Sequence, residues 1–164
     1  LCHRIDKQTS GCLVLAKNKK SVKHFSNLSK ANQIKKNYIA VVKGKFKGKE
    51  VISNEIYKKN SLKLKKSKSV FKLVKHLKKA SIVSVDIQTG RTHQIRIHAS
   101  QLQHPVLFDN KYGDALFNKS IDIDFRRTLA LHAKLISFKD QNSKVIKATA
   151  KYPDELKNLI EALM

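Results

Sequence analysis

Two neighbouring segments, residues 69–77 and 80–87, constrain the fold of this chain more than any other part of the sequence. Their β-branched and aliphatic residues are Val70, Leu73, Val74, Ile82, Val83, Val85 and Ile87. Side chains of this kind fit a pleated, half-buried surface, and the dipeptide Lys78-Lys79 between the segments fits a turn. The sequence therefore predicts an antiparallel hairpin near the middle of the chain, and with it a sheet.

The remaining segments predict more strands and a smaller number of helices. Further strands are expected at 11–17, 38–42, 129–138 and 145–150, with a basic hairpin or meander at a sheet edge over 45–68. Apolar side chains at helical spacing predict helices at 20–32, 92–103 and 154–163. A chain of 164 residues is long enough for one domain with a core. We predict a single α+β domain in which helices flank a mixed, mostly antiparallel sheet.

Positive charge dominates the composition and predicts a polyanionic partner. The formal net charge is +23, and between Lys17 and Lys79 there are 21 lysines but only two acidic residues, Glu50 and Glu55. Lysines contact nucleic-acid phosphates without reading the sequence of bases. A lineage that favours lysine would also produce such a surface and accounts for part of the excess. Nucleic acid is the expected partner.

The sequence gives no sign of a membrane segment or of a disulfide framework. No apolar run approaches the roughly 20 residues that span a bilayer, and no segment has the two faces of an interfacial helix. Cys2 and Cys12 are the only cysteines, which fits a reducing compartment. We expect a cytoplasmic monomer that does not bind membranes.

A zinc site could be imagined from the two cysteines together with His3, His93 and His98. The chain has no C-x-x-C pair, however, and His93 and His98 are five positions apart rather than the four that place two ligands on one helix face. No metal ion is expected.

Arginine is rare, and three of the five arginines lie in two short motifs. The first motif is His3-Arg4-Ile5-Asp6 and the second is Gly90-Arg91-Thr92-His93-Gln94-Ile95-Arg96. A guanidinium is a rigid planar fork that can hold a carboxylate or a phosphate with two hydrogen bonds, whereas a lysine ammonium is a hydrated point charge. The two motifs are therefore expected where geometry matters.

Asp6 is the acidic residue of these motifs, and a lone carboxylate limits the chemistry. Glycosidases need two carboxylates at a set separation, and metal-dependent nucleases need clustered acids. A single carboxylate can act as a nucleophile on carbon when a positive group keeps it ionised, and Arg4 and Arg91 are the candidates for that group. A purely structural aspartate–arginine ion pair is the other interpretation that these residues leave open.

The motifs together resemble those of the RluA-type family of pseudouridine synthases. The string His3-Arg4-Ile5-Asp6-Lys7-Gln8-Thr9-Ser10-Gly11 is similar to the family signature H-R-L-D-x-x-T-S-G. Residues 90–98 resemble the second large motif, and Lys36-Asn37-Tyr38 with Ala40 resembles the K-x-Y-x-A element. Residues 104–113 and 131–133 match two further elements in the same order, and Phe108-Asp109 resembles the RluC type, which acts on the large ribosomal subunit.

This resemblance implies a pseudouridine synthase catalytic fold and an isomerisation of specific uridines in large-subunit ribosomal RNA without a cofactor. The uridine would leave its stack, be detached from ribose at nitrogen and be rejoined through carbon; base flipping costs about a few kcal/mol. Asp6 would be the nucleophile, and Tyr38 would lie against the flipped base and could take a proton late in the reaction. Arg91 would pair with Asp6.

The resemblance also implies substrate contacts outside the catalytic set. Arg4 would hold the RNA backbone or fill the gap that the base leaves, and Leu131 would form an apolar wall of the uracil pocket. Ile95 and Arg96 would bind or support the substrate. The histidines His93, His98 and His132 are expected to pack or to support other residues.

The chain departs from the family pattern at its start. Family members normally carry early strands of the catalytic sheet, and often an S4-type RNA-binding domain, before the aspartate motif. We therefore expect residues 1–164 to be a partial catalytic domain that lacks those strands and any S4-type domain. The alternative to an active enzyme is a catalytically impaired remnant that still binds RNA.

Overall fold

The central hairpin of the computed structural model confirms the first prediction. The structure describes residues 1–57, 63–123 and 127–164. Strands β4 (Leu64–His76) and β5 (Ala80–Ile87) pair antiparallel, and the amide of Leu77 donates to the carbonyl of Ala80, 2.9 Å away, to close the turn. Strand β5 has the predicted bounds, and six of its eight residues are buried.

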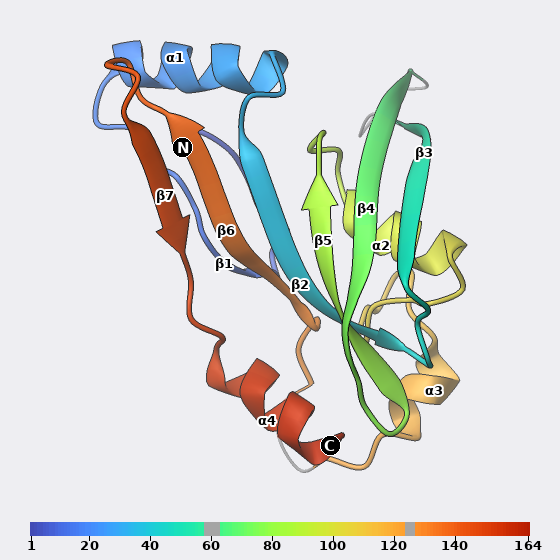
Figure 1. The fold of residues 1–164 in the computed structure, drawn as a ribbon. Coiled ribbons are helices and arrows are strands. Elements are labelled where there is room, and N and C mark those ends of the chain that lie inside the picture. The colour runs from blue at the N-terminus through green and yellow to red at the C-terminus, as the bar shows by residue number, and fades with distance from the viewer. Residues whose placement is uncertain (58–62, 124–126) are drawn as a thin grey trace.

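Within the described residues, the hairpin is part of a seven-stranded sheet with the order β1-β6-β2-β5-β4-β3 and with β7 paired to β6 (Figure 1). The other strands are β1 (Ser10–Gly11), β2 (Lys35–Lys43), β3 (Lys49–Tyr57), β6 (Leu131–Lys139) and β7 (Val145–Thr149). All strand pairs are antiparallel except β1 with β6. The predicted mixed, mostly antiparallel sheet is confirmed, and β3 lies at its edge as expected.

The helices follow the predicted pattern with shifted ends. They are α1 (Lys19–Lys30), α2 (Gln94–Gln101), α3 (Ala115–Lys119) and α4 (Asp154–Ala162). Helix α1 begins earlier than predicted because the side chain of Asn18 caps it by accepting from the amide of Ser21 at 2.9 Å. Helix α2 is shorter than the predicted 92–103 because His93, just before it, has a left-handed backbone with φ of 55°. Helix α3 was not predicted.

The strand predicted at 11–17 is wrong beyond Gly11. At Gly11 φ is 112°, and a Cβ there would lie 2.3 Å from the carbonyl oxygen of Ala133, so the chain bends away from β6 at a position that only glycine fits. Cys12 and Val14 then pack against a second cluster around Phe25 of α1. Their apolar character reflects this packing rather than a strand. Part of the predicted 45–68 meander, residues 58–62, lies outside the described residues.

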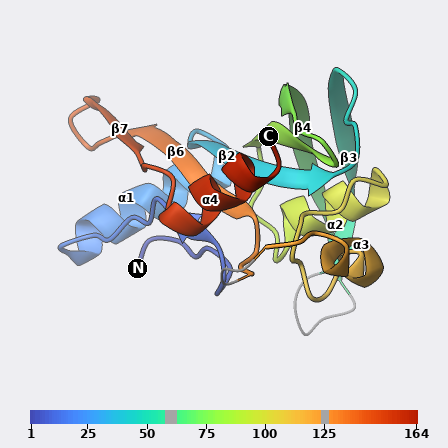
Figure 2. The same ribbon diagram turned by 90° about the horizontal axis from the view of Figure 1, so that it is seen from below.

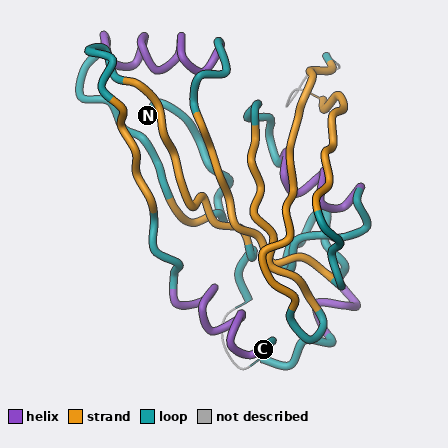
Figure 3. The backbone as a smooth tube through the Cα atoms, viewed as in Figure 1, coloured by secondary structure: helices purple, strands orange, loops and turns teal. Residues whose placement is uncertain are grey.

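The helices lie at separate places along the sheet (Figure 1). Figures 1 and 2 show α1 near the ends of β6 and β2 and α2 beside β3 and β4. Figure 3 shows that the N-terminal residues and the segment between α2 and α3 are loops. Of the described helices, the longest has 12 residues, and none is long and apolar enough to span a bilayer.

Candidate active site

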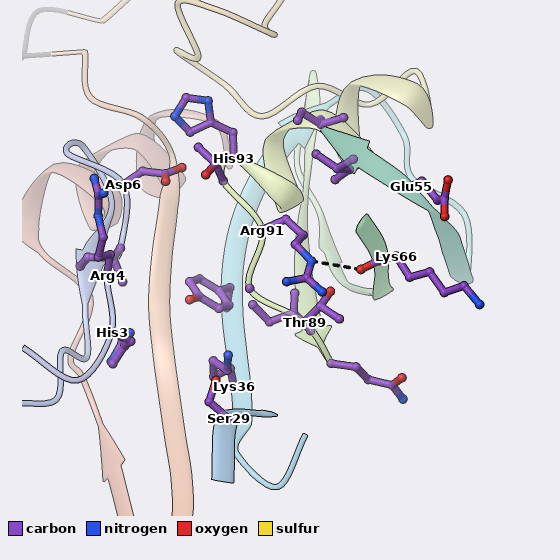
Figure 4. A pocket seen from close by; sticks show the side chains of 18 of the residues that line it. His3, Arg4, Asp6, Ser29, Lys36, Glu55, Lys66, Thr89, Arg91 and His93 are labelled. Carbon is purple, nitrogen blue, oxygen red and sulfur yellow. Dashed lines mark hydrogen bonds between the residues drawn. The ribbon is translucent and has the colours of Figure 1, made fainter. Parts of the chain in front are cut away.

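A cleft of about 1490 Å³ brings the two arginine motifs together. One wall is the N-terminal segment with His3, Arg4 and Asp6, and the other is the loop before α2 with Arg91 (Figure 4). Tyr38 of β2 also lines the cleft. Residues more than 80 positions apart in the sequence therefore face the same space.

Asp6 is held in the cleft by the turn that leads into β1. The amide of Thr9 donates to the carbonyl of Asp6 at 2.9 Å, and Ser10 and Gly11 then pair with β6. The carboxylate keeps 25% of its side-chain surface exposed, and its Oδ2 lies 3.4 Å from Nη1 of Arg96. Asp6 is thus open to the cleft and paired loosely with a cation.

Arg96 is fixed in turn by Asp109. Its Nε and Nη2 each donate to one carboxylate oxygen of Asp109 at 2.7 Å, and the two side chains are 10% and 1% exposed. Such a two-bond contact orients the guanidinium as well as binding it. The hydrogen bonds and charge of Asp109 raise the pKa of Arg96, so Arg96 stays charged.

The loop after Asp109 completes this network. The amides of Lys111 and Tyr112 donate to Oδ1 of Asp109 at 2.9 and 3.0 Å. Burial favours a higher pKa for Asp109, but the hydrogen bonds from Arg96 and from these two amides outweigh it and hold the pKa below its ordinary value. Gly113 closes the loop tightly, since a Cβ there would lie 2.2 Å from the carbonyl oxygen of Asp109.

Two rings surround the Arg96 network on the cleft side. The guanidinium carbon of Arg96 lies 5.3 Å from the ring centre of Tyr112, within the range of a cation–π contact. Nδ1 of His93 lies 3.2 Å from the Tyr112 hydroxyl. Burial lowers the pKa of His93 although Asp6 acts against it, so His93 is mainly neutral at pH 7.

Tyr38 lies on β2 at the middle of the sheet and is 9% exposed. Burial, and after it the charge of Asp6, raises the pKa of Tyr38 to about 12. The side chain therefore presents a neutral phenol to the cleft at physiological pH.

The predicted pair of Arg91 with Asp6 is not present among the described residues, where Arg96 takes that place. The amide of Arg91 donates to Oε1 of the buried Gln94, and its Nε donates to the carbonyl of Lys66 on β4 at 3.1 Å (Figure 4). Gln94 also holds Thr89 and Lys68, so this loop is tied to β4. The guanidinium of Arg91 is consequently held at β4, while Arg96, inside α2, contacts Asp6.

Two residues predicted to contact the substrate do not line the cleft in the described part of the chain. Leu131 and Ile95 are 4% and 5% exposed, belong to the main hydrophobic core and do not line the cleft. Both residues were expected to contact the substrate, but their side chains pack β6 and α2 into the core. Arg4, in contrast, is exposed and lines the cleft as expected.

Two of the three histidines expected to pack or to support other residues, His98 and His132, do so, whereas His93 lines the cleft. His98 is fully buried, with Nδ1 2.9 Å from the Ser69 hydroxyl and Nε2 2.7 Å from Oδ1 of Asn54, which ties α2 to β3 and β4. Nδ1 of His132 lies 2.8 Å from the Ser10 hydroxyl. Among the described residues, no group of three or more His, Cys, Asp and Glu side chains could hold a metal ion.

Sequence reasoning missed the roles of Asp109 and Lys36. Asp109 was noted only as part of a motif, and its distance of 13 positions from Arg96 gives no local signal. Lys36 also lines the cleft, but nothing distinguishes it by type from the other lysines of the chain. Its place in the K-x-Y-x-A element, two residues before Tyr38, was the available signal.

Comparison with known proteins identifies the family. The family model described as RNA pseudouridylate synthase matches residues 1–101. The chain is 30% identical over 175 residues to "Ribosomal large subunit pseudouridine synthase C" of Haemophilus influenzae, covering 99% of this chain and 54% of that protein. It is 35% identical over 167 residues to the protein of the same name from Buchnera aphidicola, covering 90% and 52%. The chain thus spans about half the length of the curated relatives it matches.

Solved structures agree with this. The structure "Human RNA Pseudouridylate Synthase Domain Containing 1" superposes with a TM-score of 0.81 at 26% identity, covering 96% of this chain and 71% of that one. For "Human RNA Pseudouridylate Synthase Domain Containing 4" the TM-score is 0.83 at 22% identity, covering 99% and 75%, which supports the fold alone. The predicted RluC-like resemblance and catalytic fold are confirmed, and the chain belongs to the RNA pseudouridylate synthase family.

Proposed function

We propose that residues 1–164 belong to the catalytic domain of an RNA pseudouridine synthase that isomerises specific uridines of large-subunit ribosomal RNA. The name shared by the curated relatives supports this substrate. The observation that carries the proposal is the cleft-facing carboxylate of Asp6, which lies 3.4 Å from Arg96, whose own position is fixed by Asp109.

Asp6 acts as the nucleophile in this proposal. At its end of the cleft it is a single carboxylate beside a fixed cation, which suits attack on carbon better than paired acid and base catalysis. The attack falls on the ribose carbon or on the uracil ring. Asp6 forms a covalent bond to that carbon, the glycosidic bond to nitrogen breaks, and the base turns. The new bond to the ring carbon then forms, the bond from Asp6 to carbon breaks, and the proton lost from the ring carbon is matched by the proton that the freed ring nitrogen gains.

Tyr38 lies against the flipped base and orients it. Because its pKa is raised to about 12, the phenol is protonated in the resting enzyme. It can accept the proton from the ring carbon only if it passes its own proton on in the same step. Arg4, at the exposed edge of the cleft, holds the RNA backbone or fills the gap left by the base. We propose a cytoplasmic monomer, which gel filtration of the chain tests in part.

The test is incubation of the 164-residue chain with unmodified large-subunit ribosomal RNA, followed by carbodiimide mapping of pseudouridine. We expect product with the unaltered chain and none with Asp6→Asn, which keeps the shape of the side chain. The matched control is Asp154→Asn on α4, whose carboxylate is 85% exposed and paired only with Lys157 among the described residues; it should leave the product unchanged.

Equal product from the Asp6→Asn variant would refute Asp6 as the nucleophile. Absence of product from the unaltered chain, with RNA binding intact, would instead favour the catalytically impaired RNA-binding remnant.

A further inference from the structure

We propose that Lys36 and Arg91 together bind one backbone phosphate of the RNA, next to the uridine that enters the cleft. This site is separate from the Asp6–Arg96–Asp109 network. It deepens the proposed function and rests on it, because it names the part of the RNA that this end of the cleft holds.

Lys36 and Arg91 are brought together by the pairing of β2 with β5. Lys36 pairs with Ile87, the last residue of β5, and the chain then turns through Gly90 to Arg91. A Cβ built on Gly90 would lie 3.4 Å from Nζ of Lys36. The ammonium therefore lies against the loop that carries Arg91. Figure 4 shows Lys36 between His3 on one wall and Arg91 on the other.

Arg91 has one fixed and one open side. Its Nε donates to the carbonyl of Lys66, which sets the direction of the guanidinium. Among residues 1–57, 63–123 and 127–164, neither of its terminal amino groups has a hydrogen-bond partner, and neither has Nζ of Lys36. Both groups line the cleft, so these donors are available to a molecule bound there.

The charge at this end of the cleft is unbalanced. Among the described residues, the acidic side chains that line the cleft are Asp6, which pairs with Arg96, and Glu55, which is exposed on β3. Burial, and after it the charge of Arg91, lowers the pKa of Lys36. Two cations are thus held near each other, partly out of water, without a described carboxylate between them. An anion bound between them would remove this electrostatic cost.

The geometry favours a phosphodiester as that anion. A guanidinium fork and an ammonium are the groups that bind phosphate oxygens. Lys36 and Tyr38 are two positions apart on β2, so their side chains lie on the same face, roughly 7 Å apart along the strand. That spacing is of the order of the distance from a base to its own backbone. A base against Tyr38 therefore places a neighbouring phosphate within reach of Lys36 and Arg91.

The test measures RNA binding without turnover. Every protein carries Asp6→Asn, the RNA is an unmodified large-subunit ribosomal RNA transcript, and affinity is measured by filter binding over a range of salt concentrations. Lys36→Met should weaken binding about tenfold at fixed salt and should reduce the slope of log affinity against log salt by about 0.7, the value for one single-strand phosphate contact. Lys36→Arg should restore most of the affinity. Circular dichroism and thermal melting show that each variant is folded.

The matched control is Lys157→Met on α4, which removes the same charge from a lysine outside the cleft. It should change neither affinity nor slope. Arg91→Met should resemble Lys36→Met, and the double variant should lose less than the product of the two single losses, because both residues hold the same phosphate. Equal effects of Lys36→Met and Lys157→Met, or independent effects of Lys36→Met and Arg91→Met, would overturn the proposal.

A further arm separates the RNA backbone from free phosphate. Inorganic phosphate at constant ionic strength should raise the melting temperature in a Lys36-dependent way much less than a short single-stranded RNA does; an equal effect would mean that the site binds a free anion and would overturn the proposal. Since binding is read without catalysis, a chain that forms no pseudouridine but keeps the Lys36-dependent slope would refute the proposed activity and leave the phosphate site standing.

Discussion

The two ends of the cleft differ in whether their positive charges are paired with carboxylates. At one end, Arg96 is almost buried and makes two hydrogen bonds to Asp109 and a longer contact to Asp6. At the other end, Lys36 and Arg91 lie close together with no described carboxylate partner. The first end is complete within the protein, whereas the second is balanced only when an anion binds. Removing Arg96 from the first end should therefore lower the free energy of unfolding, whereas removing the Lys36 ammonium from the second end should raise it.

The largest effect on stability is expected from Arg96→Met, which removes the buried ion pair between Arg96 and Asp109. This change leaves the carboxylate of Asp109, 1% exposed, without its cation, and removing one partner of a buried pair typically costs about 3 to 5 kcal/mol. Urea unfolding followed by circular dichroism measures the loss. Arg91→Met is the matched control and should change the free energy of unfolding by less than about 0.5 kcal/mol, because Arg91 has no charged partner among the described residues. A loss below 1 kcal/mol for Arg96→Met would show that Asp109 is not dependent on it.

The next effect concerns the helix that carries Arg96. Burial lowers the pKa of His98 in α2 to about 4, from an ordinary value of 6.5. Below pH 6.5 the unfolded chain binds a proton that the folded chain does not, so stability is complete above pH 6.5 and falls between pH 6.5 and 4, by up to about 3 kcal/mol. Urea unfolding at a series of pH values measures this fall.

Two variants assign that fall to His98. His98→Asn removes the titrating group and should flatten the profile between pH 6.5 and 4, even though the variant is less stable overall. The exposed His76→Gln should keep the profile of the unaltered chain. An unchanged profile in His98→Asn would mean that other groups cause the fall.

A smaller effect on stability, of opposite sign, is expected at the end of the cleft that holds Lys36 and Arg91. Lys36→Met removes a partly buried cation whose pKa is lowered by burial and by Arg91, while it keeps most of the aliphatic stem. We expect the variant to be more stable by about 1 kcal/mol, since it removes both the cost of partly burying the ammonium and its repulsion by Arg91. Thermal melting at pH 7 measures the gain, with Lys157→Met as a control that should not gain. Loss of stability in Lys36→Met would show that its ammonium has a partner in the protein.

The sequence predicts the strands and helices of the fold better than the side-chain contacts within the cleft. The β-branched segments of β4 and β5 predict strands because burial and β-propensity act together there, and β5 has the expected bounds. The apolar segment after Gly11 looks equally strand-like, yet it packs on α1. Its glycine has a conformation set by the close approach of β6, which no local pattern records.

In the candidate site, too, the sequence predicts which residues lie together but not which of them form ion pairs. Asp6, Tyr38 and Arg4 were predicted on the residues of two motifs, and they do line one cleft. The partner of Asp6 was assigned to Arg91, whereas the ion pair in the described residues is with Arg96. That choice depends on Asp109, which is buried in a loop after α2, and on Gln94, which draws the Arg91 loop toward β4. Contacts between distant segments of this kind are tertiary and leave no spacing in the sequence.

The smallest effect on stability is expected from Asp6→Asn, the variant that should have the greatest effect on activity. The 3.4 Å contact to Arg96 is long and the carboxylate is one-quarter exposed, so the pair resembles a surface ion pair worth about 0.5 kcal/mol or less. Asparagine can still accept from Arg96, and Arg96 keeps both bonds to Asp109. Urea unfolding should therefore place Asp6→Asn within about 0.5 kcal/mol of the unaltered chain. A loss near that of Arg96→Met would mean that Asp6 is a structural partner of Arg96, the alternative left open by the sequence, and would weaken its assignment as a nucleophile.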